Sequence, residues 1–239
     1  MTDTIAMPDQ TEEVAEGREL VDFMTRRART YGLLARIFRV EVDGKFLEEL
    51  RHLRFPTSTG NEHVDYGYRT MYNYLKGTWE DTLLDLARDY ARTFIGHGNN
   101  GRSAAYPFES VYRSEKHLLM QESRDEVLAC YRAAGLEKDE SWREGEDHVA
   151  LEFEYMSTMA TRAADALRST DTKLAQDLLN DQSHFLQDHL NAWVPNFTKD
   201  VERCATTKFY RGFALITRGY LECEMELFGD LAEQEETAA

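Results

Sequence analysis

Apolar residues recur at intervals of three and four along most of the chain, and this period constrains the fold more than any other feature. Such spacing places apolar side chains on one face of an α-helix. No segment alternates apolar and polar residues as a half-buried strand does, and there is no internal repeat. The sequence therefore predicts an all-α fold, a single globular domain of about nine to eleven helices. The first stretch with this period carries Leu20, Phe23, Met24, Arg27, Tyr31, Leu34 and Phe38.

The helical pattern divides the chain into one domain and two short tails. Residues 1–17 are polar, acidic and without periodicity, so we expect a disordered tail there and a second one at 230–239. The domain between them, 18–229, is large enough to bury a core without disulfide bonds. Thr78 is the expected N-cap of one helix, and Pro195 is expected to follow the end of another. Helices are predicted near 18–38, 44–53, 62–76, 79–95, 123–134, 148–167, 171–182, 185–194, 197–205 and 207–228.

The charge balance limits the classes of partner. Among 239 residues there are 44 acidic and 28 basic side chains, and the formal net charge is −16. A protein that binds nucleic acid neutralises phosphates with basic residues, so this balance argues against nucleic acid and against an anionic membrane surface. A cationic partner is favoured instead, because opposite charge speeds the encounter.

Cysteine usage and hydropathy indicate a cytoplasmic protein. Cys130, Cys204 and Cys223 stand singly, and none is paired with a nearby histidine in the sequence. This pattern is typical of a reducing compartment and predicts neither a disulfide nor a zinc site. No uncharged run approaches the ~18 residues of a membrane span. The Arg26-Arg27 pair is not an export signal, because acidic and charged segments around it leave no apolar region.

The segment Tyr106-Pro107-Phe108-Glu109-Ser110-Val111-Tyr112 differs from the amphipathic helices on both sides of it. Three aromatic rings and one carboxylate follow a glycine-rich stretch, and the proline favours an extended conformation before it. Rings give contact area at low entropic cost and a carboxylate selects positive charge, so the segment suits a surface that holds a peptide. The alternative is that the segment starts a helix and its aromatic rings fill the core.

The Asp147-His148 pair precedes a long predicted helix and also has two interpretations. An acid at a helix N-terminus is favoured by the helix dipole, which alone accounts for Asp147. The carboxylate is equally able to orient the imidazole of His148 and leave one ring nitrogen for a partner. The sequence does not decide between them.

Two further patterns point to enzymes but lack the required context. The segment Gly96-His97-Gly98-Asn99-Asn100-Gly101 matches Gly-x-Gly-x-x-Gly, yet a helix precedes it where a dinucleotide fold needs a strand. We expect a helix end and a flexible loop, with nucleotide binding and weak hydrolysis as the alternative function. His184 and His189 lie five residues apart, a poor spacing for one metal. Asp181 and His184 form an acid-x-x-His pair, but a di-iron bundle needs two Glu-x-x-His motifs and two further carboxylates. No metal site is therefore expected.

Three motifs together resemble a known family. They are Tyr106-Pro-Phe-Glu-Ser-Val-Tyr112, Glu144-Gly-Glu-Asp-His148 and Phe185-Leu-Gln-Asp-His-Leu-Asn-Ala-Trp193. Their order and spacing resemble those of the TorD/DmsD/NarJ family of maturation chaperones for molybdenum oxidoreductases, over roughly residues 20–228. The family pattern is Glu-Pro-x-Asp-His, and Gly145 stands here in place of the proline.

The resemblance implies an all-helical cytoplasmic chaperone with no enzymatic activity and no cofactor of its own. Family members bind the twin-arginine signal peptide, or a related N-terminus, of a molybdopterin oxidoreductase catalytic subunit, and hold that subunit until its cofactor is inserted. They occur as monomers or domain-swapped dimers. By position, the residues that the family uses for peptide binding are Tyr106, Pro107, Glu109, Ser110, Tyr112, Asp147 and His148.

Overall fold

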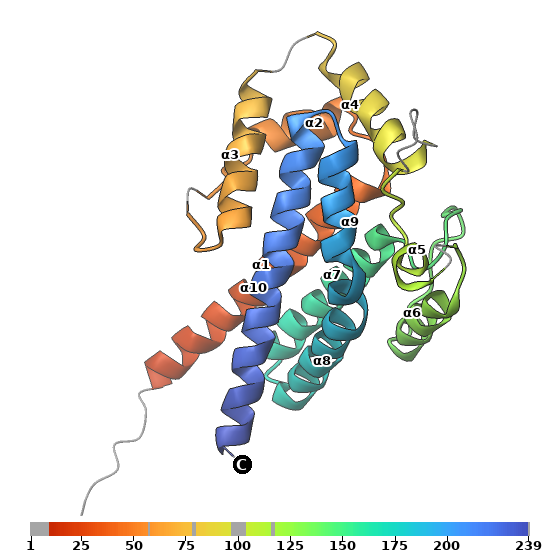
Figure 1. The fold of residues 1–239 in the computed structure, drawn as a ribbon. Coiled ribbons are helices and arrows are strands. Elements are labelled where there is room, and N and C mark those ends of the chain that lie inside the picture. The colour runs from red at the N-terminus through yellow and green to blue at the C-terminus, as the bar shows by residue number, and fades with distance from the viewer. Residues whose placement is uncertain (1–9, 57, 78–79, 97–103, 116–117, 239) are drawn as a thin grey trace, which may run out of the picture.

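The computed structural model describes residues 10–56, 58–77, 80–96, 104–115 and 118–238 (Figure 1). Most of these residues lie in helices. The all-α prediction is confirmed for this part of the chain. No helix in the same ranges is both long enough and apolar enough to cross a membrane. The α-helices are α1 (Gln10–Arg39), α2 (Gly44–His52), α3 (Glu62–Lys76), α4 (Thr82–Tyr90), α5 (Glu109–Arg113), α6 (Glu122–Ala133), α7 (Val149–Arg168), α8 (Thr172–Phe185), α9 (Asn191–Cys204) and α10 (Lys208–Ala238). Two π-helical turns, η1 (Ala91–Ile95) and η2 (Leu186–Leu190), follow α4 and α8.

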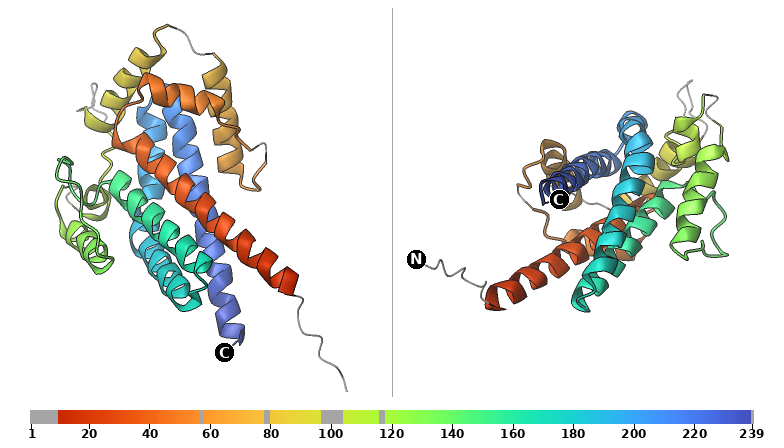
Figure 2. Two further views of the ribbon diagram at one scale, coloured as in Figure 1. Left: turned by 180° about the vertical axis from the view of Figure 1, so that it is seen from behind. Right: turned by 90° about the horizontal axis from the view of Figure 1, so that it is seen from below.

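Both terminal helices are longer than the sequence pattern predicted. α1 begins at Gln10 and α10 runs to Ala238, so the described parts of the two expected tails are helical. Both segments are rich in Ala, Glu and Gln, which have high helix propensity, so a helix continues there without apolar periodicity. Figure 2 shows the outer ends of α1 and α10 extending from the same end of the molecule.

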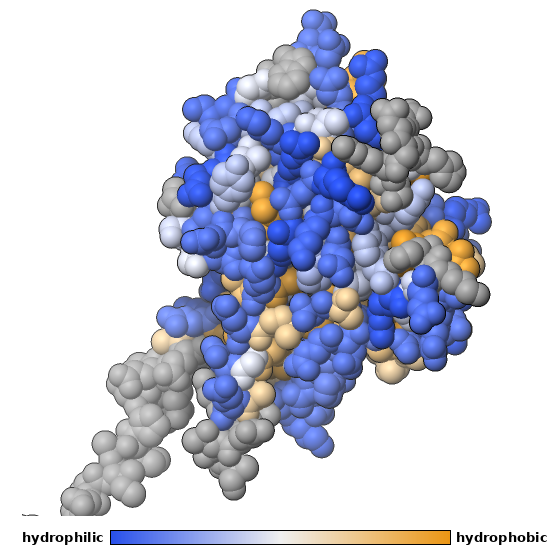
Figure 3. Space-filling view, in the orientation of Figure 1, coloured by the Kyte–Doolittle hydropathy of each residue, from blue (hydrophilic) through white to orange (hydrophobic). Residues whose placement is uncertain are grey.

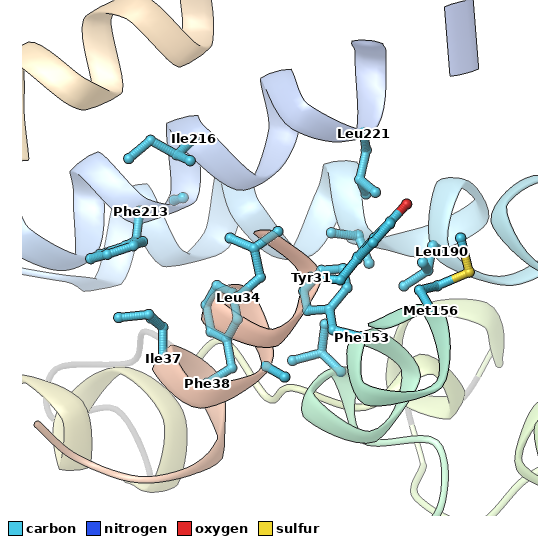
Figure 4. Packing of buried hydrophobic residues seen from close by; sticks show 14 of the residues in the cluster. Tyr31, Leu34, Ile37, Phe38, Phe153, Met156, Leu190, Phe213, Ile216 and Leu221 are labelled. Atoms are coloured by element: carbon cyan, nitrogen blue, oxygen red, sulfur yellow. The ribbon is translucent and has the colours of Figure 1, made fainter. Parts of the chain in front are cut away.

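The core lies where α1 crosses the other long helices. α1 packs along α7, and α10 packs along α3. On α1, Tyr31 and Phe38 are fully buried and both contact the ring of Phe153 on α7, with centroids 6.0 and 6.2 Å away. Figure 4 shows this layer together with Phe213 and Leu221 of α10. The face predicted for the first helix is confirmed from Met24 to Phe38, whereas Leu20 is 41% exposed.

A buried ion pair joins the two terminal helices. Arg27 of α1 donates from Nη2 to Oε2 of Glu224 of α10 at 2.6 Å, and Tyr31 donates its hydroxyl to the same oxygen at 2.8 Å. Both charged residues are 3% exposed. A carboxylate removed from water in this way needs its charged partner, so the pair fixes how α1 and α10 lie together.

Glycines set the close approach of α3 and α10. A Cβ atom built on Gly67 of α3 would lie 2.7 Å from Cγ1 of Ile216 and 2.8 Å from the carbonyl oxygen of Gly212, both on α10. Gly219 of α10 is equally tight against Val64 of α3. Only residues without a side chain allow this backbone separation.

The helix predicted to end before Pro195 continues through it. α8, η2 and α9 form one helical run from Thr172 to Cys204, with Pro195 inside α9. A proline ring clashes with the carbonyl group four residues earlier, here that of Asn191, and prolines therefore bend helices. The wide π turn immediately before Asn191 changes the helix geometry at this point, and the run is not interrupted. The expected N-cap Thr78 lies outside the described residues.

Candidate functional site

The structure joins the two segments that carry the predicted site residues. The amide of Val149 donates to the carbonyl of Pro107 at 2.9 Å, and the amide of Glu109 donates to the carbonyl of Asp147 at 3.0 Å. Phe108 and His148 form an antiparallel bridge between these bonds. Residues that are about 40 positions apart in the sequence thus form one rigid unit, which we call the motif junction (residues 106–112 and 144–149).

The junction caps two helices with neighbouring side chains. Oδ2 of Asp147 accepts from the amide of Ser110 in the first turn of α5 at 2.9 Å. Nδ1 of His148 accepts from the amide of Ala150 in the first turn of α7 at 3.1 Å. Asp147, His148 and Ser110 are all buried. The carboxylate therefore serves α5 and the imidazole serves α7, which favours a capping role for both groups.

His148 is held as a neutral ring. Burial and the nearby charge of Arg39 lower the pKa of His148 to about 3. The edges of two rings surround it, those of Phe108 at 5.0 Å and Trp142 at 5.1 Å between centroids. A neutral imidazole leaves Nδ1 unprotonated, as its bond from the Ala150 amide requires.

Gly145 fits the junction because it has no side chain. A Cβ atom at this position would lie 2.8 Å from Oδ1 of Asp147 and 3.7 Å from the ring of Phe108. Any larger residue would have to displace the carboxylate that caps α5. The glycine that replaces the family's proline is thus matched to the packing of Asp147 in this chain.

Glu109 points into the protein. Its side chain is fully buried, accepts from Nη1 of Arg113 at 2.6 Å, and lies 3.2 Å from Nδ1 of His189 of η2. Behind it, Glu152 of α7 accepts from Nε1 of Trp193 at 3.0 Å. Burial and the charge of Glu109 raise the pKa of Glu152 well above its usual range.

The sequence prediction missed the partners of these acids. His189 and Trp193 belong to the third motif, but their roles were not assigned, and Arg113 and Glu152 carry no motif signal. The contact between His189 and Glu109 spans 80 positions of sequence. The one available signal was the His189-x-x-x-Trp193 spacing, which places both rings on one helical face.

A cavity opens beside the junction, between α1, η1 and the start of α7. Its volume is about 420 Å³, and Tyr106, Pro107 and His148 contribute to its wall. The other four predicted site residues, Glu109, Ser110, Tyr112 and Asp147, are not among the residues that line the cavity. Tyr112, for example, donates its hydroxyl to Asp200 at 3.1 Å and contacts the ring of Trp193. The remaining lining residues are Arg39, Val40, Glu41, Tyr90, Ala91, Phe94, Ile95, Phe108 and Glu144.

The cavity combines apolar walls with acidic groups. Phe94 and Phe108 are buried in its wall, whereas Ile95 is 67% exposed. Glu41 and Glu144 are exposed at the same opening. Arg39 contributes a positive charge, but it pairs with Glu154 and lies over the ring of Trp142. Such a cavity accommodates an apolar side chain and attracts a cation to its edge.

Residues 61–199, more than half of the chain, match the family model described as nitrate reductase delta subunit. The chain belongs to this family. The resemblance to TorD/DmsD/NarJ chaperones is thereby confirmed.

Similar proteins in this family are named as chaperones. The TorD chaperones of Vibrio parahaemolyticus and Shewanella loihica are each 25% identical to this chain. The matches cover 82% and 85% of this chain and 92% and 93% of those proteins. A solved structure from Archaeoglobus fulgidus is described as a candidate redox enzyme maturation protein. It matches this chain with a TM-score of 0.48 and 16% sequence identity, and the match covers 92% of this chain and 99% of that one.

The glycine segment that prompted the nucleotide alternative is not part of the described site. Gly96 ends η1, and its amide donates to the carbonyl of Ala91 at 2.7 Å. This agrees with the expected helix end. Residues 97–101, which carry the rest of the pattern, lie outside the described residues.

Proposed function

We propose that this protein is a cytoplasmic maturation chaperone that binds the twin-arginine leader, or a related N-terminal segment, of a molybdopterin oxidoreductase catalytic subunit. The observation that carries the proposal is the cavity beside the motif junction, which five residues of the family's motifs line: Tyr106, Pro107, Phe108, Glu144 and His148. The chaperone holds the subunit for cofactor insertion before export or assembly. The three cysteines of the chain are free thiols, as a reducing compartment favours.

The chemistry of the cavity fits the chemistry of such a peptide. A twin-arginine leader has a cationic region followed by ~7–15 apolar residues. In our proposal, the carboxylates of Glu41 and Glu144 bind arginine, because a guanidinium forms two parallel bonds to a carboxylate. The apolar part of the leader contacts Ile95 and the ring of Tyr106.

Exposed apolar residues near the junction support the proposed contact with the apolar part of the leader. The segment between α5 and α6 carries Leu118, Leu119 and Met120, which are 50%, 51% and 67% exposed. Figure 3 shows apolar surface beside α5, next to mainly hydrophilic neighbours. Consecutive exposed apolar residues of this size are typical of interaction sites.

The buried motif residues act in this proposal by holding the junction. Asp147 fixes the start of α5, and His148 fixes the start of α7. Glu109 is already paired with Arg113 and His189. We therefore assign direct contact to Tyr106 and Pro107, which line the cavity. Positioning of the loop is assigned to Glu109, Ser110, Tyr112, Asp147 and His148.

Calorimetry with synthetic leaders tests the proposal. We would titrate the protein with the leaders of molybdoenzyme subunits from the same genome, each beside a control in which Lys-Lys replaces Arg-Arg. Tight binding of one leader, weakened in its control, is the expected result. Equal affinity for leader and control would reject arginine recognition, and the absence of heat with every leader would reject leader binding altogether.

A further inference from the structure

A cysteine, a histidine and a glutamate from three helical segments form a connected group outside the cavity. Sγ of Cys130, on α6, lies 3.8 Å from Nε2 of His189 on η2. Nδ1 of the same ring lies 3.2 Å from both carboxylate oxygens of Glu109 on α5. No sequence motif indicates this group, because Cys130 and His189 are 59 positions apart.

The ring between them is a cation at neutral pH. Burial of His189 disfavours its charged form, but hydrogen bonds to Cys130 and Glu109 outweigh that effect and raise the pKa of His189 to about 9. With both nitrogens protonated, Nδ1 donates to Glu109 and Nε2–H points at the sulfur. Tyr131 and Tyr155 also lie close to Cys130, and burial raises the pKa of both hydroxyls, so both are neutral.

The thiol at Cys223 has the opposite surroundings. It is partly buried on α10, and burial together with the charges of Glu226, Glu222 and Glu224 raises its pKa. An adjacent imidazolium stabilises a thiolate, whereas carboxylates and burial oppose it. The two cysteines therefore differ in the sign of the charge beside the sulfur, which makes Cys223 an internal reference for Cys130.

We propose that Cys130 is a nucleophilic thiol that hydrogen peroxide converts to a sulfenic acid, with His189 as its activating cation and Glu109 as the positioning residue for that cation. Cys130 is partly exposed on α6. The site does not depend on the proposed peptide function, so either can fail alone.

The oxidation of Cys130 needs only the peroxide and the side chains of this group to balance its atoms, electrons and protons. The thiolate sulfur attacks one peroxide oxygen, an S–O bond forms and the O–O bond breaks. Sulfur is oxidised by two electrons and the peroxide is reduced. The departing hydroxide takes the Nε2 proton of His189 and leaves as water, and the other oxygen keeps its proton in the sulfenic acid. A later thiol reductant returns Cys130 to its starting state.

Competitive labelling of the full chain tests the proposal. The native protein would be treated with a limiting amount of iodoacetamide at about pH 6.5, and the modified fraction at each cysteine measured by peptide mass spectrometry. We expect Cys130 to react at least about tenfold faster than Cys223, because the reaction requires thiolate. A peroxide-and-dimedone experiment should mark Cys130 first. Equal rates at the two sites would overturn the proposal without the need for any variant.

His189→Gln separates activation from exposure. The substitution keeps a hydrogen-bonding side chain but removes the cation, so the Cys130 rate at about pH 6.5 should fall by about tenfold or more, with Cys223 unchanged. An unchanged Cys130 rate in a variant that circular dichroism shows to be folded at the labelling pH would show that His189 does not activate the sulfur.

Discussion

His148 and His189 should give the stability of this protein opposite dependences on pH. The folded-state pKa of His189 is about 9, above the usual 6.5, so its contribution is full below about pH 6.5 and is lost as the pH rises through 9. The folded-state pKa of His148 is about 3, so its contribution is full above about pH 6.5 and is lost as the pH falls toward 3.

The size of each effect follows from the shift. One pKa unit corresponds to about 1.4 kcal/mol of differential interaction. The shift of His189 from 6.5 to about 9 is worth on the order of 3 kcal/mol of unfolding free energy, and that of His148 from 6.5 to about 3 on the order of 5. His148 is almost fully enclosed, so solvent screens its contribution little, whereas His189 lies nearer the surface and its figure is an upper bound. The free energy of unfolding should therefore pass through a maximum near neutral pH.

Urea denaturation at fixed ionic strength, repeated from about pH 5 to about pH 9.5, measures this profile. His189→Gln should flatten the alkaline side and leave the acid side. His148→Asn should flatten the acid side, because the Asn side chain also accepts from a helix amide but does not titrate. An alkaline slope that persists in His189→Gln would refute the assignment, and so would a wild type of constant stability between about pH 7 and about pH 9.5.

Two more substitutions test the packing of the long helices. Arg27→Met should lower the free energy of unfolding by about 3–5 kcal/mol, because it leaves Glu224 buried without its cation. Adding Glu224→Met to this variant should restore much of the loss. If chemical denaturation showed that the two losses add, this explanation would be contradicted. Gly67→Ala should cost about 1–3 kcal/mol by forcing α3 away from α10. Gly229→Ala, where a Cβ meets nothing within 4 Å, is the matched control and should be neutral or stabilising.

Local sequence features predicted the helices well wherever the determining forces are local. The period of three and four residues placed the buried face of α1, and Gly135 marked the end of α6 because its φ of +66° suits glycine. Pro195 misled the prediction because the helix boundary there depends on the π turn before it. The ends of α1 and α10 were missed because helix propensity continues where apolar periodicity stops.

The candidate site was only partly readable from the sequence for a different reason. The motifs identified the right two segments, and the structure joins them through backbone hydrogen bonds. The sequence could not show that Glu109 and Asp147 point inward, because their partners His189 and Ser110 are distant along the chain. Nor could it reveal Glu41 or Ile95, which belong to no motif and reach the cavity only through the packing of α1 against η1 and α7.

Charge reversal at the cavity edge tests the proposed peptide site most directly. Glu144→Lys and Glu62→Lys change the net charge equally, but Glu144 lies at the cavity, whereas Glu62 is exposed on α3 and is not among the residues that line it. Placing like charges together at an interface costs several kcal/mol, so Glu144→Lys should weaken binding of the leader by at least about tenfold, while Glu62→Lys changes it little. Equal losses in the two variants would mean that only the overall charge attracts the peptide and that this cavity does not bind it.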